Sequence, residues 1–217
     1  MTKKTPKYQR YQDYVISDGK LIAEFEEMYQ DYEDPWNQTK KGIYATDEVI
    51  TANLIRKLNV KRVIELGCGL GHFTNLISST GVEVLGVDIS KTAIEKAKKN
   101  FSKCNFKVGD ILDYEIYQEF KPDLIIMAQI TWYVLDKLDD FLLFLRNEVP
   151  NIYLIHLLVT YPLGVQKYGA ERFSSLDEIM RYFDMNYLEW GEMNWYDDDC
   201  AHTYFLGQWK EIRKVGA

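Results

Sequence analysis

One stretch, residues 63–74 with the sequence VIELGCGLGHFT, constrains the fold of this chain more than any other. Its first four residues are typical of a buried strand. The glycines that follow, Gly67, Gly69 and Gly71, let the backbone turn tightly and approach a ligand closely. The next residues begin a helix, whose N-terminus offers free N–H groups and the positive end of a dipole. The stretch therefore predicts a strand–turn–helix unit suited to a nucleotide-like cofactor.

Short apolar segments alternate with helical patterns after residue 62. Strands are expected over 63–66, 82–87, 105–108, 123–128 and 151–158, and helices over 70–79, 90–101 and 135–147. This alternation predicts a parallel sheet with helices on both faces, and right-handed crossovers make it a Rossmann-like doubly wound α/β fold. Two aromatic-rich strands, 185–193 and 203–212, follow a capped helix at 175–183 and are expected to pair as a hairpin. The predicted sheet has seven strands, mostly parallel with an antiparallel C-terminal β-hairpin.

The N-terminal part of the chain has a different pattern, and residues 1–46 are expected to form a helical lid or arm. Apolar residues at 21, 22, 25, 28 and 29 predict an amphipathic helix over 20–32, which ends at Asp34-Pro35-Trp36. The segment before it carries tyrosines at 8, 11 and 14 and is either an arm or a short helix. A helix over 47–58, capped by Thr46, begins the second unit, which is expected to span 47–217.

The composition restricts the class of partner. A net charge of −7 argues against a nucleic-acid-binding protein, which usually has a basic face. Three widely spaced cysteines give neither a disulfide framework nor zinc-ligand spacing, and they favour a reduced, cytoplasmic setting. No segment approaches the roughly 20 apolar residues of a membrane span. We therefore expect a cytoplasmic monomer or homodimer that acts on a small molecule, without metal, membrane or nucleic acid.

The spacing of the glycines distinguishes between cofactors. A dinucleotide site requires the pattern G-x-G-x-x-G, and His72 stands where the third glycine would fall. Asp88 ends the second expected strand, about 20 residues after the turn, where a carboxylate can accept hydrogen bonds from both ribose hydroxyls. Asp110 follows the third strand. Because the carboxyl ends of parallel strands meet at one edge of a sheet, the two carboxylates are expected to face the same crevice.

Three segments, residues 65–71, 86–90 and 109–111, resemble the first three motifs of the class I S-adenosylmethionine-dependent methyltransferases. The resemblance implies S-adenosyl-L-methionine as the cofactor. In this family's pattern Glu65 supports the glycine turn against the methionine part, Asp88 binds the ribose and Asp110 accepts from the adenine amino group. The cofactor-binding residues that the resemblance implies are Glu65, Gly67, Cys68, Gly69, Gly71, Asp88, Ile89, Asp110, Ile111, Gln129 and Ile130.

Methyl transfer from a sulfonium is an in-line displacement, in which the protein positions the acceptor, excludes water and removes a proton from a hydroxyl acceptor. His156, at the ligand end of the fifth strand, is predicted to be the general base, and Tyr133 a second catalytic residue. The alternative interpretation of His156 is a buried structural histidine, and an amine acceptor needs no base. His202 is expected at the surface of the hairpin turn, and the acidic run before it is interpreted as solvated rather than metal-binding.

The acceptor site is predicted from aromatic and basic residues outside these motifs. Segments 34–36 and 42–44 resemble the lids of small-molecule methyltransferases that modify sugars and related metabolites. The predicted acceptor-binding residues are Trp36, Tyr44, Trp132, Tyr161, Lys167 and Arg172. Of these, Lys167 and Arg172 would bind an anionic group such as a phosphate or carboxylate. Residues 128–133, AQITWY, lack the Asn/Asp-Pro-Pro-Tyr/Phe run of the amino-methylases that act on adenine or glutamine.

The sequence thus favours methylation of a small polar metabolite, at oxygen rather than nitrogen, with a carbohydrate-related or phosphorylated compound as the expected acceptor. Two alternatives remain open at this point. One is a NAD(P)-dependent oxidoreductase, which the missing third glycine disfavours. The other is a regulatory module that binds the cofactor without turnover.

Overall fold

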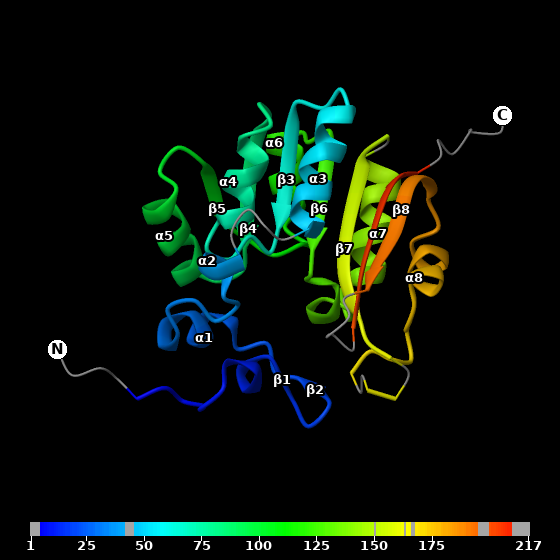
Figure 1. The fold of residues 1–217 in the computed structure, drawn as a ribbon. Helices are drawn as coiled ribbons and strands as arrows, with labels where there is room; N and C mark the ends of the chain where they lie inside the picture. The colour runs from blue at the N-terminus through cyan, green and yellow to red at the C-terminus, as the bar shows by residue number, and fades with distance from the viewer. Residues whose placement is uncertain are drawn as a thin grey trace.

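The computed structural model describes residues 5–41, 46–149, 151–162, 164–165, 168–194 and 200–209. Within this part of the chain, seven strands form one sheet in the order β5-β4-β3-β6-β7-β9-β8 (Figure 1). The strands are β3 (Arg62–Leu66), β4 (Glu83–Asp88), β5 (Asn105–Val108), β6 (Leu124–Ala128), β7 (Tyr153–Thr160), β8 (Asn186–Asn194) and β9 (Ala201–Gln208). Strands β3 to β7 are parallel, and β9 pairs antiparallel with both β7 and β8. The predicted doubly wound α/β sheet with an antiparallel hairpin is confirmed.

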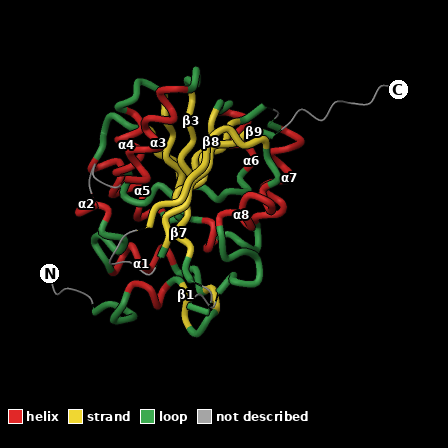
Figure 2. The backbone as a smooth tube through the Cα atoms, turned by 45° about the vertical axis from the view of Figure 1, so that its right-hand side comes forward, coloured by secondary structure: helices red, strands yellow, loops and turns green. Residues whose placement is uncertain are grey.

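Helices cover both faces of the sheet (Figure 2). They are α3 (Thr46–Lys57), α4 (His72–Ser78), α5 (Lys91–Asn100), α6 (Tyr114–Phe120), α7 (Leu138–Glu148) and α8 (Leu176–Phe183). Strand β6 is apolar throughout because it lies between two cores. Ile125 and Met127 pack into a core with α6, α7 and α8, whereas Leu124 and Ile126 pack into a second core with α3 and α4. Successive side chains of a strand point to opposite faces, so a strand with two cores has no polar face.

The N-terminal segment differs from the prediction. The helix expected over 20–32 is α1 (Phe25–Asp31), and the residues before it form a two-stranded hairpin of β1 (Ile16–Ser17) and β2 (Lys20–Leu21). Asp18 and Gly19 both have positive φ, 50° and 73°, which is the geometry of a two-residue hairpin turn with an Asp-Gly sequence. This local turn preference overrides the helical spacing of the apolar residues. Helix α6 was not predicted, and the segment expected as an arm or a short helix contains a 3-10 turn, η1 (Tyr11–Tyr14).

The N-terminal segment lies beneath the carboxyl ends of the parallel strands (Figure 1). Its core is an aromatic cluster around Tyr14, whose ring contacts Tyr8 and Tyr32 with centroids 4.7 and 5.9 Å apart. Helix α1 contacts the N-terminus of α5 through the carboxylate of Glu26. The Glu26 carboxylate accepts from Ser90 Oγ and from Thr92 N and Oγ1 at the N-terminus of α5. The negative carboxylate of Glu26 is attracted to the N-terminus of α5, because a helix N-terminus carries a partial positive charge.

This contact gives a prediction for Glu26. Burial raises the pKa of its carboxyl, but hydrogen bonds from Thr92 and Ser90 outweigh burial and lower the pKa to about 2. We expect Glu26→Gln to lower the free energy of opening of α1 by about 1–3 kcal/mol, measured by hydrogen exchange of residues 25–31, because charge-assisted hydrogen bonds are lost. Since the folded pKa is lowered, the contribution is complete above pH 4.5 and disappears as the pH falls towards 2. The exposed neighbour Glu27 is the control, and equal effects of Glu27→Gln and Glu26→Gln would contradict the role of Glu26.

None of the helices in the described residues is both long and apolar enough to cross a membrane. In the same part of the chain, no group of three or more His, Cys, Asp or Glu side chains is arranged to hold a metal ion. The acidic turn at 197–199 lies outside the described residues.

Candidate active site

A cavity of about 760 Å³, here called the main cavity, lies at the carboxyl ends of β3 to β7. The N-terminal segment forms its outer wall with Tyr11, Phe25 and Trp36, and α3 contributes Asp47 and Glu48. Helix α2 (Gln38–Lys41) adds the side chain of Gln38. Ligands in open α/β sheets bind in this position, outside the carboxyl ends of the strands. The fold therefore places the predicted cofactor motifs around one enclosed space.

The glycine turn after β3 is built for close approach. Gly67 lines the main cavity with φ of 72°, and a Cβ atom there would clash with Cγ2 of Ile130. Gly71, with φ of 82°, is the N-cap of α4, and a Cβ there would lie 2.6 Å from Phe106. Cys68, Gly69 and Gly71 are not among the described lining residues, and Cys68 is buried in a small core with Phe106. The predicted contact of this turn with the cofactor thus rests on Gly67.

Gln38 supports the turn from the N-terminal segment. Its Oε1 accepts from Leu70 N at 2.8 Å, and its Nε2 donates to Cys68 O at 3.4 Å. An amide side chain thus provides partners for two backbone groups of the turn. Sequence reasoning missed Gln38, because no local pattern marks a residue that acts on a loop about 30 positions later.

Two buried carboxylates flank the turn. Asp88 accepts from Gly69 N and Ser90 N, each at 2.9 Å, and burial raises its pKa to about 6. Glu65 accepts from the hydroxyl of Thr74, and burial raises its pKa to about 8. Both residues line the main cavity. An ionised carboxylate has about four acceptor positions, so each group retains acceptor capacity towards a ligand.

The far end of the main cavity carries the third motif. Asp110 Oδ1 accepts from Leu112 N at 3.0 Å, and Asp110 Oδ2 accepts from Lys137 Nζ at 2.5 Å. Ile89 is 51% exposed and Ile111 is 7% exposed, and both line the cavity beside Asp110. Lys137 was not predicted, since it belongs to the loop before α7 and meets Asp110 only through the fold.

Aromatic side chains close the opposite end. The main cavity is lined by Trp36, Trp132 and Tyr161, which were predicted to bind the acceptor. It is also lined by Tyr133, which was predicted to be catalytic. The Trp36 and Tyr133 rings lie 5.7 Å apart, and Trp132 Nε1 donates to Val159 O at 2.8 Å. Burial raises the pKa of the Tyr133 hydroxyl well above its usual value, so Tyr133 remains protonated and is a poor base. Trp132, Tyr133 and Tyr161 also line a second cavity of about 630 Å³ behind the β1–β2 turn.

The structure gives no support to His156 as the general base. Its side chain is fully buried, stacked on Phe205 at 4.8 Å, with Nε2 2.7 Å from Thr131 Oγ1. Burial lowers its pKa to about 3, and it does not line either of the cavities described above. A side chain at position 156 points to the α7–α8 core because its strand neighbours 155 and 157 point to the other face. The interpretation as a buried structural histidine fits these contacts.

Of the two predicted basic acceptor residues, Arg172 is described, and it is not brought to the site. Arg172 Nη1 lies 3.2 Å from Asp139 Oδ2 and 3.1 Å from the Tyr182 hydroxyl, and Arg172 lines neither cavity. Tyr44 and Lys167 lie outside the described residues. The described part of the acceptor side therefore contains aromatic and acidic groups in place of the expected cations.

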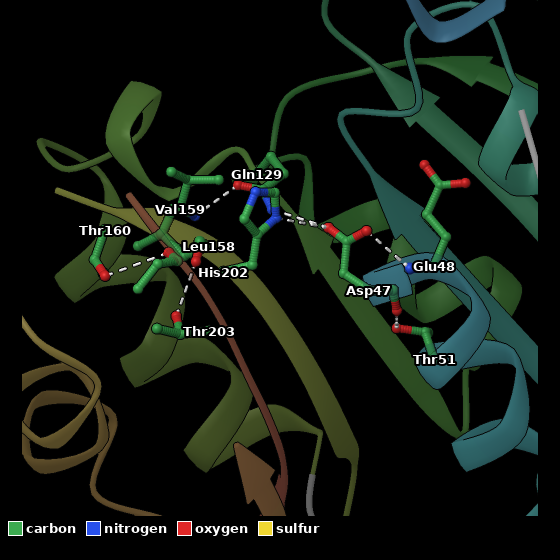
Figure 3. Close-up of polar contacts among 10 residues, drawn as sticks. Asp47, Glu48, Thr51, Gln129, Leu158, Val159, Thr160, His202 and Thr203 are labelled. Carbon is green, nitrogen blue, oxygen red and sulfur yellow. Dashed lines mark hydrogen bonds and ion pairs between the residues drawn. The ribbon is translucent and has the colours of Figure 1, made fainter. Parts of the chain in front are cut away.

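A polar cluster that was not predicted lies on the acceptor side (Figure 3). His202 on β9 has its Nδ1 3.7 Å from Asp47 Oδ2, and Gln129 Nε2 donates to the same oxygen at 3.3 Å. All three residues line the main cavity. The prediction of a surface position for His202 is wrong, because β9 lies between β7 and β8 rather than at the edge of the sheet.

The residues of the main cavity fit S-adenosylmethionine. Gly67 leaves room at the turn, Asp88 and Asp110 offer acceptors at consecutive strand ends, and Ile89 and Ile111 provide apolar surface between them. Glu65 and Asp88 have raised pKa values, as carboxylates do when they are buried without a neighbouring cation. The sulfonium and the ammonium of the cofactor would supply that positive charge. When bound, this cofactor presents an electrophilic methyl group.

The comparisons with known proteins agree with this site. A family model described as a methyltransferase domain matches residues 57–167, just over half of the chain. A putative methyltransferase of Invertebrate iridescent virus 6 is 32% identical over 91 residues, 39% of this chain and 34% of that protein. The ubiquinone biosynthesis O-methyltransferase of Haemophilus ducreyi is 24% identical over 211 residues, 82% of this chain and 87% of that protein. Other curated relatives carry the names of RNA methyltransferases.

Among solved structures, the N-methyltransferase NodS of Bradyrhizobium japonicum WM9 in complex with S-adenosyl-L-homocysteine superposes with a TM-score of 0.59 and 16% identity, over 81% of this chain and 93% of that one. This likeness concerns the fold. The chain spans less than half the length of the first curated relatives that it matches. With the matching family model, the seven-stranded sheet and the three motifs around one cavity, the chain belongs to the class I S-adenosylmethionine-dependent methyltransferases.

Proposed function

We propose that the protein methylates a small polar acceptor, uncharged or cationic, at an oxygen atom inside the main cavity, with the N-terminal segment as its lid. The observation that carries this proposal is the composition of the cavity wall. Aromatic side chains from the lid and from the loops after β6 and β7 line the acceptor side, and a histidine–carboxylate pair lies among them. Concave pockets with apolar and aromatic walls and a few placed polar groups suit small molecules.

The charge of the main cavity supports an acceptor without negative charge. Its described lining carboxylates are Asp47, Glu48, Asp110 and Asp136 together with the raised-pKa pair Glu65 and Asp88. The one lysine or arginine among the described lining residues is Lys137, and it is paired with Asp110 at 2.5 Å. A phosphate in this cavity would meet like charges at close range, which raises its free energy. We therefore do not retain a phosphorylated acceptor in the proposal.

An amine acceptor is the second candidate, because an acidic cavity also attracts a protonated amine. Methyl transfer to nitrogen requires the neutral amine, whereas transfer to a hydroxyl benefits from a base. The presence of His202 next to Asp47 is the reason to place oxygen first.

A matched acceptor panel tests the proposal. Glucose, glucosamine and glucosamine 6-phosphate differ by one amine and one phosphate, and catechol adds an aromatic diol. With ¹³C-methyl-labelled cofactor, the carbon chemical shift of the product separates O-methyl from N-methyl. We expect O-methylation of an uncharged member and at least tenfold lower turnover of the phosphate. Preference for the phosphorylated compound, or methylation of an RNA and of no panel member, would contradict the proposal.

The buried carboxylate of Glu65 gives a prediction for pH. Its pKa of about 8 in the free protein means that it is largely protonated at pH 7, and a cation bound beside it favours the ionised form. Cofactor binding then releases a proton below pH 8. We expect the dissociation constant for S-adenosylhomocysteine to fall by up to tenfold per unit as the pH rises from 6 to 8, and to level off above 8.

Calorimetry in buffers of different ionisation enthalpy counts the protons released on binding. In Glu65→Gln this pH dependence should disappear between pH 7 and 8, while any contribution of Asp88, whose pKa is about 6, remains at lower pH. A wild-type dissociation constant that is constant between pH 7 and 8 would exclude the ammonium of S-adenosylhomocysteine, whose sulfur is uncharged, as a neighbour of Glu65.

A further inference from the structure

His202 and Asp47 come from opposite sides of the main cavity. Asp47 is in the first turn of α3, and His202 lies on β9 opposite Val159 of β7. Figure 3 shows the imidazole of His202 turned towards the Asp47 carboxylate, and the Nδ1 to Oδ2 distance is 3.7 Å. This distance is within ion-pair reach and longer than a hydrogen bond. Catalytic hydrogen bonds are often long in ligand-free proteins and shorten when the ligand binds.

The Asp47 carboxylate is held in place by two donors. Its Oδ1 accepts from Glu48 N at 3.0 Å, and its Oδ2 accepts from Gln129 Nε2 at 3.3 Å. The Gln129 side chain is itself fixed, because its Oε1 accepts from Val159 N at 2.7 Å. Gln129 has a φ of 62°, a left-handed backbone that is unusual for a residue other than glycine. Such backbone strain persists where the surrounding contacts hold it, and it is frequent at active sites.

The backbone that carries His202 is held by the sheet. Thr203 Oγ1 donates to Leu158 O at 2.9 Å, so β9 is tied to β7 by a side chain as well as by the ladder (Figure 3). The His202 side chain is 27% exposed and that of Asp47 is 13% exposed. Both line the main cavity, so the pair is accessible to a small molecule.

The orientation of the His202 ring gives its two nitrogens different surroundings. Nδ1 faces Asp47, with its Oδ2 at 3.7 Å. A carboxylate beside Nδ1 favours the tautomer with the proton on Nδ1, which leaves Nε2 as an acceptor. Besides Asp47 and Glu48 from α3, the described titratable groups of the cavity wall that His202 shares are Tyr11, Tyr29, Glu65, Asp88, Asp110, Tyr133, Asp136, Lys137 and Tyr161, and the described lining residue from β8, Met193, is uncharged.

We propose that His202 is the proton acceptor for the hydroxyl that is methylated, and that Asp47 is the residue that positions its imidazole. The inference rests on the proposed function. The acceptor oxygen forms the new C–O bond with a lone pair as the methyl carbon–sulfur bond breaks, with its electron pair remaining on sulfur. The hydroxyl proton passes to Nε2 of His202, and the imidazolium beside Asp47 then releases it to water.

The other candidates for this role fail on geometry or on protonation. His156 lies in the core behind Thr131, and the Tyr133 hydroxyl has a raised pKa and stays protonated. Lys137 is bound to Asp110 at 2.5 Å, at the end of the cavity that the third motif assigns to adenine. His202 is thus the described cavity residue with an imidazole nitrogen near the acceptor side.

The first experiment needs neither an acceptor nor turnover. In protein with ¹⁵N-labelled histidine, the nitrogen chemical shifts of His202 report which ring nitrogen carries the proton. We expect Nδ1–H in the wild type, with and without S-adenosylhomocysteine, and a shift towards the Nε2–H form in Asp47→Ala. The spectrum of His72 is an internal control, because His72 is not among the lining residues. An Nε2–H tautomer in the wild type, or an unchanged tautomer in Asp47→Ala, would overturn the pairing.

The second experiment measures turnover of the panel defined above. His202→Gln is expected to lower kcat for O-methylation by about 10²-fold and to remove the acidic limb of the pH–kcat profile, while the dissociation constant for S-adenosylhomocysteine stays within twofold. His72→Gln should keep wild-type kcat. Normal turnover in His202→Gln overturns the proposal even when the cofactor binds. Failure of the wild type to bind S-adenosylhomocysteine would instead reject the proposed function, and if no panel member is methylated, the tautomer measurement alone decides.

Discussion

Replacing Asp88 by alanine is expected to raise the dissociation constant for S-adenosylhomocysteine by about 10- to 150-fold. The expected loss is a charge-assisted hydrogen bond to the ribose, which contributes about 1.5–3 kcal/mol. The same substitution leaves Gly69 N and Ser90 N without their acceptor, so the free energy of unfolding should fall by about 1–3 kcal/mol. Calorimetric titration and urea unfolding measure the two effects separately.

Asp123→Ala is the matched control for this experiment. Asp123 also accepts from two backbone N–H groups, Lys61 N at 2.7 Å and Arg62 N at 2.9 Å. It precedes β6, at the amino ends of the parallel strands and away from the main cavity. We expect some loss of stability in Asp123→Ala with an unchanged dissociation constant. If the two variants weaken the cofactor equally, the effect of Asp88→Ala comes from stability alone and the ribose contact is wrong.

Gly67→Ala is expected to produce the largest loss of stability, about 2–5 kcal/mol. A non-glycine residue at a φ of 72° adds about 1–2 kcal/mol of backbone strain. The new methyl group also clashes with Cγ2 of Ile130, and overpacking of this kind costs about 1–3 kcal/mol. Because Ile130 lines the main cavity, its displacement should weaken S-adenosylhomocysteine by about tenfold or more.

The substitution Gly81→Ala distinguishes the backbone strain from the clash with Ile130. It has a φ of 91°, and a Cβ there would meet no atom within 4 Å. Gly81→Ala should therefore show the backbone strain alone, about 1–2 kcal/mol, with normal cofactor affinity. The double variant Gly67→Ala/Ile130→Ala removes the clashing methyl and should recover part of the lost affinity. Equal stability losses in Gly67→Ala and Gly81→Ala would show that the contact with Ile130 has no energetic effect.

Local patterns were sufficient for the architecture. Strand β6 is apolar at every position because alternate residues enter different cores, as Ile125 and Ile126 do, and such a run is readable without knowledge of its neighbours. The carboxylates Asp88 and Asp110 were placed correctly at one edge of the sheet, since parallel strands bring their carboxyl ends together. The turn at Asp18 was missed, although its Asp-Gly sequence is a local signal, because helical spacing of the apolar residues was given more weight.

The acceptor side could not be predicted in the same way. His156 and His202 lie on neighbouring strands, yet one is sealed in the core and the other faces the main cavity. Which face a side chain takes depends on strand register, and a shift of one residue reverses it. The partner of His202 is 155 positions earlier in the chain, on a helix whose docking no local pattern describes. The chain's own residue order thus specifies the cofactor-binding edge, whereas long-range packing of β9 against β7 and α3 creates the histidine–carboxylate pair.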